Sequence, residues 1–474
     1  RSAGQEEPAE AEAEALVAWL GEKGAEFDGV RIAFDGGAGR RLVAARPLPA
    51  GFTFLRLPER CALTPTTCAA SPVGRRIQER HRLVVPEDFS VNQLEEAIES
   101  GANCVTYRTV LYAFLLVAPE DDSFGPFLRH LRRKLESPGG TPHVWSEADR
   151  ARLPGNVASD LQEYEAHVLG QHQAMFPGLC EAFPQDFPLA ACSEARWRRA
   201  HSLVTSNAFP GEGPKGDADG VLLPLLDCVN HDSEAANVQW LGLGLGAGRG
   251  ARVTRPMLEG EELLYSYGLK GNGALTLGYG FAVWDNPNET MPLQLQVPSS
   301  LRPASRAWNV AVRELQQAVA EACRDNRTSA ELLVPGSATF RLALEDLEQG
   351  TLPPGLRRAA AAVGGAEALR RLLLEAGKAL MRRREGDESE AMAGGAWGHH
   401  ERVVRRRDSV KVGSQCCACT PQGCAVAIRS SQLQVLAAAL DLLAEELADG
   451  SAEREAGGVR SCLCACRRRR EGQQ

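Results

Sequence analysis

The sequence predicts an α+β protein in which a helical segment interrupts a β-rich domain and an all-α C-terminal domain follows. Short strands, separated by glycine and proline, occupy residues 30–64 and return at residues 220–266. Between them, residues 92–206 have the apolar spacing of amphipathic helices. Residues 298–448 are rich in strong helix formers. A chain of 474 residues has room for two or three domains of this kind.

The first domain is predicted over residues 13–297, with the helical insert at about residues 92–206. We expect the small, acidic residues 1–12 to be disordered and Ala13–Phe27 to form one amphipathic helix. A β-hairpin is predicted next, with Pro49-Ala50-Gly51 as its turn. The later strands are expected at Gly220–Leu226, Ala236–Leu241, Ala251–Thr254, Glu262–Ser266 and Met291–Val297.

The helical C-terminal domain is predicted over residues 298–448 and a Cys/Arg-rich tail over residues 449–474. The tail closes on Arg467–Arg470, which is most simply a solvated end; a nuclear or nucleic-acid address is the alternative. The strongest helical segments are Trp308–Cys323, Leu356–Arg383 and Ser431–Leu447.

Composition narrows the class of protein. Apolar residues make up 44% and charged residues 24% of the chain, which excludes a collagenous or mostly disordered protein. A net charge of −8 disfavours a nucleic-acid groove binder. The richest apolar run, Val110–Ala118, is too short to cross a bilayer. We therefore expect a soluble, intracellular monomer without nucleic-acid or membrane partners; a first residue of Arg rather than Met leaves open a targeting peptide.

The 14 cysteines fall into two groups. Half are scattered singly and are expected to be reduced, mostly buried thiols. The others cluster in Cys416–Cys424 and Cys462–Cys466, where short spacing leaves zinc binding as an alternative. Neither cluster has the paired C-x-x-C pattern of a zinc site, so we expect unliganded thiols and no metal.

Polar residues follow directly on an apolar strand in Leu222–Asp232 (LLPLLDCVNHD). They are Asp227 and the triplet Asn230-His231-Asp232. A buried Asn-His pair must be hydrogen-bonded, and at a strand end such groups meet a ligand or cap a turn. Both alternatives stay open, whereas a metal site lacks a second ligand at the usual spacing.

Two tyrosines, Tyr267 and Tyr279, each precede a glycine within Glu261–Phe281. A tyrosine in a strand commonly packs in the core or at its rim. The functional alternative is that phenol oxygens at strand ends line a narrow polar channel. The sequence contains no G-x-S-x-G, H-E-x-x-H, Walker or kinase motif, so hydrolase, metalloprotease and phosphoryl-transfer activities lack support.

A glycine-rich stretch, Gly36-Gly37-Ala38-Gly39, precedes the predicted strand Arg41–Ala45. A dinucleotide-binding fingerprint would require a helix at this point, so that interpretation fails. A hairpin turn and a ligand-binding loop both remain open.

Taken in order, these segments resemble a SET-domain protein methyltransferase, in the branch that includes the Rubisco large-subunit lysine methyltransferase. The resemblance covers the chain from about Leu16 to Leu447. The pairing of NHD with YSYG and YGF at this spacing is its specific feature. Its other markers are RRLVAARPLPAG, SFGPFLRHL, PHVWSEADRARLPGN, LVTSNAF, GLKGNGALTLG, TLPPGLRRA and AVAIRSSQLQVLAAALDLL.

The resemblance implies a SET fold split by a helical insert, a helical substrate-binding domain, and S-adenosylmethionine as the cofactor. It implies that the backbone of Ala38-Gly39-Arg40 and the pair Asn230-His231 hold the cofactor, with Phe281 packing near its adenine. By the same resemblance Tyr267 is the catalytic tyrosine. Tyr279 is its catalytic neighbour, and with Asp227 it lines the channel for the target residue.

Two positions depart from the family pattern. Arg41 replaces the second glycine of the Gly-x-Gly motif, and Asn207, which we also place at the cofactor, stands where an arginine is common. The activity expected is protein-lysine N-methylation. Protein-histidine methylation on the same scaffold and a catalytically silent SET-like binding module are the alternatives. Methyl transfer from a sulfonium needs positioning and a deprotonated amine, so a metal or a general-base triad is not required.

Overall fold

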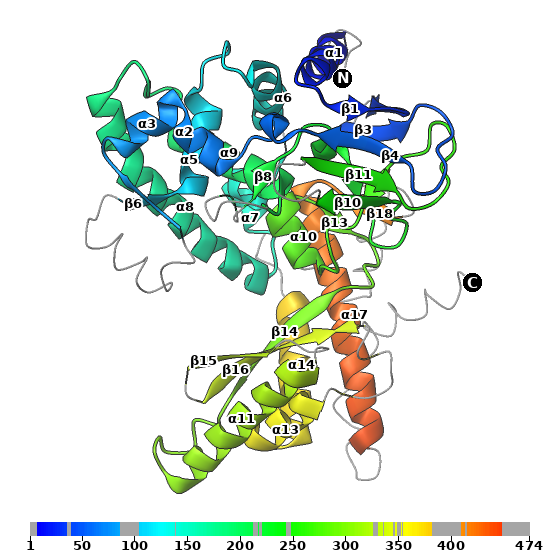
Figure 1. Ribbon diagram of the computed structural model, residues 1–474. Coiled ribbons are helices and arrows are strands. Elements are labelled where there is room, and N and C mark those ends of the chain that lie inside the picture. Colours follow the sequence, from blue (N-terminus) through cyan, green and yellow to red (C-terminus); the bar gives the residue numbers. More distant parts are fainter. Residues whose placement is uncertain are drawn as a thin grey trace.

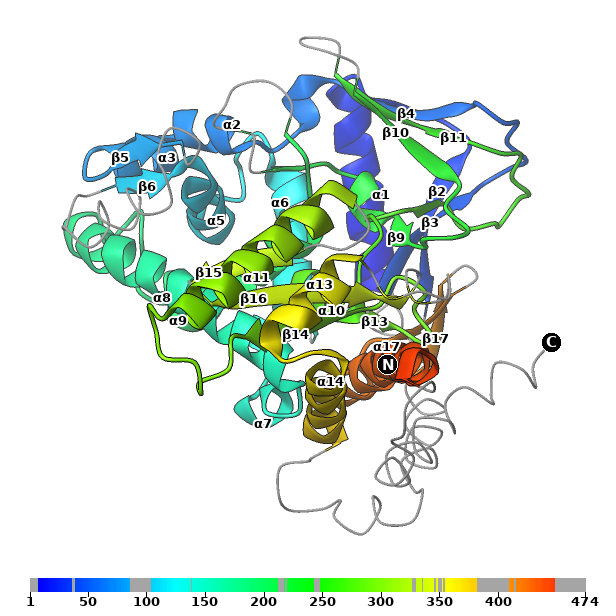
Figure 2. The same ribbon diagram turned by 90° about the horizontal axis from the view of Figure 1, so that it is seen from below.

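The computed structural model describes residues 7–35, 39–85, 104–137, 139–211, 217, 220–242, 248–325, 330–334, 336–344, 347, 352, 354–381, 409–412 and 415–447. These residues form two parts, one above the other in Figure 1. The upper part holds the short strands and the helical insert, which lie on opposite sides when the molecule is seen from below (Figure 2). The lower part is built from the C-terminal segment.

Small sheets make up the β-rich half of the upper part. Its elements are α1 (Glu7–Glu22), β1 (Glu26–Phe27), β2 (Val30–Asp35), β3 (Gly39–Ala44), β4 (Thr53–Leu57), β7 (Ala208–Phe209), β8 (Val221–Leu222), β9 (Asn230–His231), β10 (Val238–Gly242), β11 (Arg249–Val253), β12 (Leu264–Tyr265), α10 (Asn272–Tyr279) and β13 (Ala282–Val283). The largest sheet has the order β1-β4-β11-β10, and β2 pairs with β3. β9 and β12 pair in parallel, which brings two distant segments together at the site.

Two expectations about the N-terminal region were wrong. β4 pairs with β1 and β11, so the predicted hairpin around Pro49-Ala50-Gly51 does not form; the hairpin is β2–β3. Gly51 instead donates its N–H to the Val253 carbonyl at 2.8 Å. Turn residues specify a chain reversal, but not the strand that pairs afterwards. Helix α1 begins at Glu7, inside the stretch expected to be disordered, because acidic residues suit a helix N-terminus.

Helices form the other half of the upper part. They are α2 (Pro65–Ala70), α3 (Pro72–Gln78), α5 (Tyr107–Val117), α6 (Gly125–Glu136), α7 (Glu147–Arg150), α8 (Gly155–Ala182) and α9 (Glu194–Asn207), with a short parallel pair β5 (Arg82–Val84) and β6 (Cys104–Thr106). Trp197 of α9 is fully buried and donates its indole N–H to the Val168 carbonyl of α8 at 2.8 Å. Leu128, Leu131 and Leu135 line the buried face of α6. His130 and Lys134, on the same helix α6, contact Asp227 of the β-rich half.

The α+β class is confirmed, but the expectation of an all-α C-terminal domain was wrong. The lower part contains β14 (Thr290–Gln296), β15 (Ala330–Val334) and β16 (Ser337–Ala343), paired in the order β14-β16-β15. Alternate residues of β16, including Phe340 and Leu342, are fully buried. The helices are α11 (Arg306–Asp325), α13 (Pro354–Val363), α14 (Ala366–Met381) and α17 (Pro421–Leu447), and β18 (Gln415–Ala418) joins β13 to β17 (Ser409–Val412).

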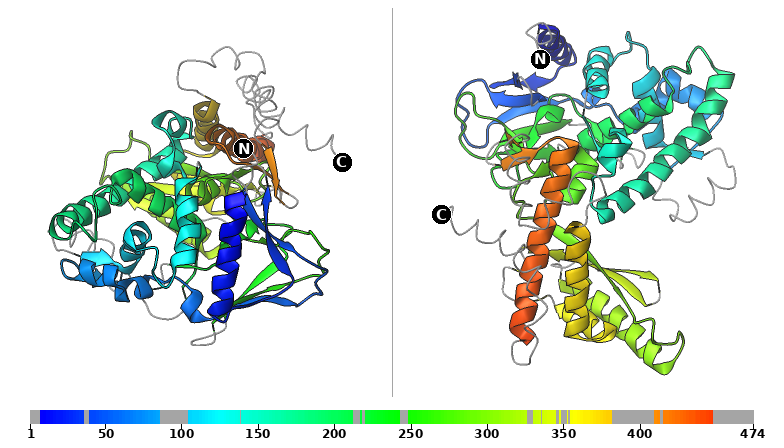
Figure 3. Two further views of the ribbon diagram at one scale, coloured as in Figure 1. Left: turned by 90° about the horizontal axis from the view of Figure 1, so that it is seen from above. Right: turned by 180° about the vertical axis from the view of Figure 1, so that it is seen from behind.

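The long helix α17 runs the height of the lower part and reaches the upper part (Figure 3). Its stretch Pro421–Ala444 has a mean hydropathy of 1.2 and is long enough to cross a membrane by length and composition. However, 61% of that window is buried inside the protein, where it packs with β14 and α14. Most of this window therefore belongs to the core of the protein.

The late cysteines are only partly described. Cys417 and Cys424 are buried and Cys419 is exposed, and none of these three forms a disulfide. Cys462–Cys466 and the predicted tail lie outside the described residues.

Candidate active site

Two cavities meet between the insert and the strands. The first has a volume of about 610 Å³ and is bordered by Arg108, Phe209, Tyr265 and Lys270. The second, of about 360 Å³, is bordered by Arg40, Arg199, Asn230 and Phe281. Five residues line both cavities, and we call them the shared wall. They are Ser206, Asn207, Asp227, Tyr267 and Tyr279.

The parallel pairing of β9 with β12 places the Asn-His pair beside the catalytic candidate. His231 is buried, and its Nδ1 accepts a hydrogen bond from the Tyr267 backbone N–H at 3.0 Å. Burial lowers the pKa of His231, which keeps the ring neutral and able to accept. The Asn230 side chain donates to Glu262 at 2.8 Å and borders the second cavity.

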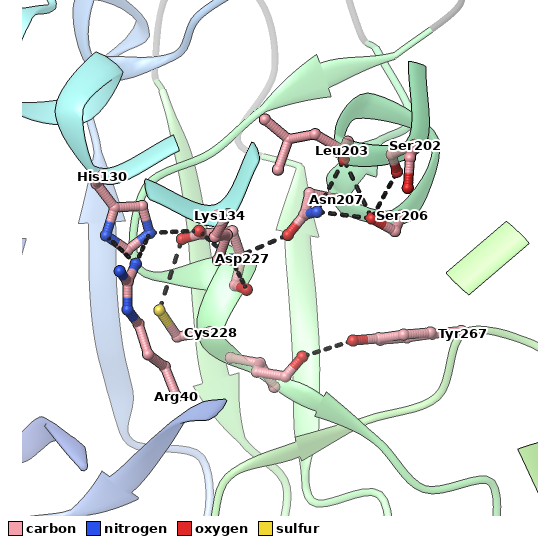
Figure 4. Close-up of polar contacts among 11 residues, drawn as sticks. Arg40, His130, Lys134, Ser202, Leu203, Ser206, Asn207, Asp227, Cys228 and Tyr267 are labelled. Carbon is pink, nitrogen blue, oxygen red and sulfur yellow. Dashed lines mark hydrogen bonds and ion pairs between the residues drawn. The ribbon is translucent and has the colours of Figure 1, made fainter. Parts of the chain in front are cut away.

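Tyr267 stands at the centre of the shared wall. Its phenol donates a hydrogen bond to the Val229 carbonyl at 2.8 Å (Figure 4), and its ring lies 4.6 Å from that of Tyr279 between centroids. Burial raises the pKa of Tyr267 well above its ordinary value and raises that of Tyr279 as well. Both phenols therefore keep their protons near neutral pH. With its proton committed to Val229, the Tyr267 oxygen has lone pairs left to accept from a ligand.

Tyr279 was expected at a strand end, and the structure corrects this: it is the last residue of helix α10. The helix stops because Gly280 adopts a left-handed conformation with φ of 80°, and a side chain there would collide with the Gly140 carbonyl. At the other end, the buried carboxylate of Glu289 accepts the Asn272 N–H at 3.1 Å and the Thr290 N–H at 2.9 Å. The two ends together hold Tyr279 against the shared wall.

A buried charge network forms one side of the wall. The Asp227 side chain is fully buried, and its Oδ2 lies 2.7 Å from Lys134 Nζ and 2.7 Å from His130 Nε2. Lys134 Nζ also donates to the Asp227 carbonyl at 2.9 Å and to Asn207 Oδ1 at 3.0 Å. Arg40 donates to His130 Nδ1 at 2.6 Å. Figure 4 shows this chain of contacts running from β3 through α6 to the end of α9.

Electrostatics divide the network into charged and neutral members. Burial alone would raise the pKa of Asp227, but the Lys134 ammonium, together with the contact from His130, outweighs burial and holds the pKa well below its usual range. Burial lowers the pKa of His130 and raises that of Cys228 to about 12, so both are neutral near pH 7. His130, Asp227 and Cys228 lie close enough to share a metal ion. The adjacent Lys134 ammonium and Arg40 guanidinium make that position unfavourable for one.

One face of α9 lines the second cavity. Its residues recur at helical spacing: Arg199, Ser202, Leu203, Ser206 and Asn207. Arg199 donates through one nitrogen to the carbonyls of Leu135 and Ser137, at 3.1 and 3.2 Å, and so ties the end of α6 to this face.

The structure brings most of the predicted site residues together. Arg40, Asn207, Asp227, Asn230, Tyr267, Tyr279 and Phe281 all border the second cavity. His231 contacts this group through the Tyr267 backbone N–H. Gly39 begins β3, and Ala38 lies outside the described residues. The roles assigned to these residues remain predictions.

Sequence reasoning missed His130, Lys134 and Arg199. The available signal was weak: His130 and Lys134 are four residues apart on a helix, beside the leucines that face the core. A polar pair in that position points inward and needs a buried partner. Nothing in the sequence shows that Asp227, 93 residues after Lys134, is that partner.

The fold and this geometry can be set beside known proteins. No family model matches the sequence. The chain is 32% identical over 169 residues to Ribosomal lysine N-methyltransferase set10 of Schizosaccharomyces pombe, covering 34% of this chain and 29% of that protein. It is 26% identical over 221 residues to Ribosomal lysine N-methyltransferase 1 of Saccharomyces cerevisiae, covering 38% and 35%. The match thus spans about a third of the length of these relatives.

The likeness to solved structures extends over nearly the whole chain and defines the class of fold. The protein has the SET-domain fold with a helical insert and a C-terminal domain, as the resemblance implied. Rubisco LSMT bound to AdoMet superposes with a TM-score of 0.61 at 17% identity, covering 92% of both chains. The SET domain of LSMT bound to lysine and AdoHcy gives 0.61 at 18% identity, again covering 92% of both.

Proposed function

We propose that the chain is an S-adenosylmethionine-dependent protein-lysine N-methyltransferase. The observation that carries this proposal is the pair of cavities separated by a wall containing Tyr267 and Tyr279. A transfer reaction needs a donor and an acceptor that approach one point from two sides. The matched relatives named as lysine methyltransferases, and the fold shared with LSMT structures holding AdoMet, lysine and AdoHcy, support the same choice.

The second cavity suits the proposed cofactor by size and chemistry. Its volume of about 360 Å³ falls within the range of small-molecule sites, roughly 300–1,000 Å³. Phe281 offers an aromatic face for the adenine, and Asn230 offers amide donors and acceptors. Arg199 and Arg40 are cations suited to a carboxylate. When bound, the cofactor supplies an electrophilic methyl group on a sulfonium.

The first cavity would hold the target lysine. A lysine amine has an ordinary pKa of about 10.4 and must lose a proton before it can attack. Enclosure among Tyr265, Tyr267 and Tyr279 disfavours the charged form and so promotes that loss. The Tyr267 oxygen, whose own proton goes to Val229, accepts an amine N–H and thereby aims the nitrogen lone pair across the wall.

The test of this function is methyl transfer itself. The full chain is incubated with methyl-labelled S-adenosylmethionine and a cell extract, and the modified residue is mapped by mass spectrometry. Label on a lysine supports the proposal, and label on a histidine favours the histidine alternative. A rise in melting temperature with S-adenosylmethionine but no transfer to any protein would favour the silent binding module.

For partners, we propose a protein substrate and a monomeric, intracellular enzyme without nucleic-acid or membrane partners. The net charge of −8 supports the absence of a nucleic-acid surface. The named relatives support a protein substrate.

A further inference from the structure

Helix α6 of the insert sends one lysine side chain into the shared wall. Lys134 Nζ has three N–H donors and three acceptors at hydrogen-bond distance: Asp227 Oδ2 at 2.7 Å, the Asp227 carbonyl at 2.9 Å and Asn207 Oδ1 at 3.0 Å. Asp227 and Asn207 both border both cavities. A single cation from the insert therefore holds two residues of the shared wall, both of which border the proposed cofactor cavity and the proposed lysine cavity.

The other groups around Asp227 are neutral or more distant. His130 lies 2.7 Å from the same carboxylate oxygen, but burial lowers its pKa, so it donates a hydrogen bond without bringing a charge. The thiol of Cys228 and the phenol of Tyr267 keep their protons because burial raises their pKa values. The Arg40 guanidinium contacts the His130 ring, at 2.6 Å from Nδ1 and 3.0 Å from Nε2, and so lies one residue away from the carboxylate. Within the described part of the chain, Lys134 is thus the cation in direct contact with Asp227.

We propose that Lys134 is a positioning residue that cancels the charge of Asp227, so that an amine entering the first cavity is not held there as its ammonium. This inference rests on the proposed lysine methylation. A carboxylate within about 4–6 Å of an amine favours its charged form and raises its pKa by roughly 1–3 units. Without Lys134, an ammonium entering the first cavity would take its place as the cation that keeps Asp227 ionised. The reaction needs the neutral amine, so this pairing would oppose it.

The first test is the pH dependence of single-turnover methyl transfer to the substrate found by labelling. Lys134→Met keeps a similar side-chain length without the charge. In this variant the rate of methyl transfer should increase with pH as in wild type, but the midpoint of the curve should lie at least about one pH unit higher, because the amine is harder to deprotonate. The double variant Lys134→Met with Asp227→Asn should return the curve toward wild type. Asp227→Asn alone should move it to lower pH, since Lys134 is then unbalanced. A merely structural role for Lys134 would lower the rate equally at all pH values.

The second test does not depend on activity or cofactor. Binding of n-butylammonium, a probe for the lysine side chain, is measured by calorimetry on the full chain at pH 7. Lys134→Met should bind it about tenfold or more tightly than wild type, and the double variant should not. Lys378→Met is the matched control, because its Nζ pairs with Glu375 at 2.8 Å on the surface, far from the cavities. Equal affinity in wild type and folded Lys134→Met, or an unshifted pH curve, would overturn the proposal. Absence of any methyl transfer contradicts the proposed function instead, and leaves the butylammonium result to decide on Lys134.

Discussion

Two buried carboxylates in this protein respond to burial in opposite ways. Asp227, in the shared wall, and Glu289, at the start of α10, both have side chains that are almost completely enclosed. The pKa of Asp227 is held well below its usual range, whereas that of Glu289 is raised to about 8. Near pH 7 the first is therefore ionised and the second is mostly protonated.

The difference lies in the partners. Burial raises the pKa in both cases, but Asp227 also touches the Lys134 ammonium at 2.7 Å. Glu289 meets neutral donors, the backbone N–H groups of Asn272 and Thr290. At Glu289 the hydrogen bonds from neutral groups lower the pKa but do not outweigh burial, whereas at Asp227 a contacting cation adds enough to do so. The carboxyl group of Asp227 is thus ionised and balanced by Lys134, and the carboxyl group of Glu289 is mostly neutral at pH 7.

The largest effect is expected when the Lys134 ammonium is removed from Asp227. Lys134→Met leaves a fully buried carboxylate without its cation, which should cost about 3–5 kcal/mol of unfolding free energy. Urea unfolding at pH 7 measures it. Lys378→Met removes an exposed ion pair of similar length and should cost at most about 0.5 kcal/mol. Equal losses in the two variants would show that burial of the pair is unimportant.

The next effect concerns the neutral hydroxyl beside Asp227. Tyr267→Phe keeps the ring packed against Tyr279 but removes the oxygen that would orient the amine. Turnover should fall on the order of 10²–10³-fold, with little change in cofactor affinity or melting temperature. Single-turnover transfer and cofactor titration measure both. Tyr164→Phe, which removes a hydroxyl bonded to His201 in the insert, is the control. If turnover stays within a few-fold of wild type, Tyr279 becomes the better catalytic candidate.

A smaller effect is expected at the cofactor side of the wall. Asn230→Ala removes a polar group that borders the second cavity and bonds Glu262 at 2.8 Å. The loss of one such partner should weaken S-adenosylmethionine binding by about 1–3 kcal/mol while the protein stays folded. Calorimetry measures the affinity, with the exposed Asn309→Ala as control. Unchanged affinity would remove Asn230 from the cofactor site.

The smallest effect, when taken per pH unit, is the pH dependence that Glu289 contributes to the free energy of unfolding. Its pKa rises from about 4.5 in the unfolded chain to about 8 in the folded protein, so the folded state binds the proton more tightly. The contribution of Glu289 to the free energy of unfolding is therefore fully present below pH 4.5. It declines by on the order of 1 kcal/mol per pH unit as the pH rises toward 8, and it does not change further above pH 8. Glu289→Gln should remove this decline. Urea unfolding from pH 4 to 9 measures it, and an unchanged slope would show that Glu289 is ionised when folded.

Sequence patterns located most elements of the upper part because local rules govern them. Alternating or periodic apolar residues marked the strands near 220–266 and the helices α5 to α9. The hairpin β15–β16 was missed, although Pro335-Gly336 is a turn dipeptide, because the surrounding residues are strong helix formers. Local propensity was overridden there by pairing with β14, a contact between distant segments.

The candidate site divides in the same way. The resemblance to the SET-domain family, carried by the order and spacing of the motifs, implied that Asn230, His231, Tyr267 and Tyr279 share one site. Lys134 and His130 could not be assigned, because their role depends on Asp227 approaching from the other side of the insert. A helical pattern says which face of α6 is buried, but not which charge it meets there. The order of residues therefore indicated the type of fold and the tyrosines of the shared wall. The ionised state of Asp227 and the neutral state of Glu289 were decided by three-dimensional packing. The reason is that a pKa depends on which charges lie within a few ångströms, and not on neighbours along the chain.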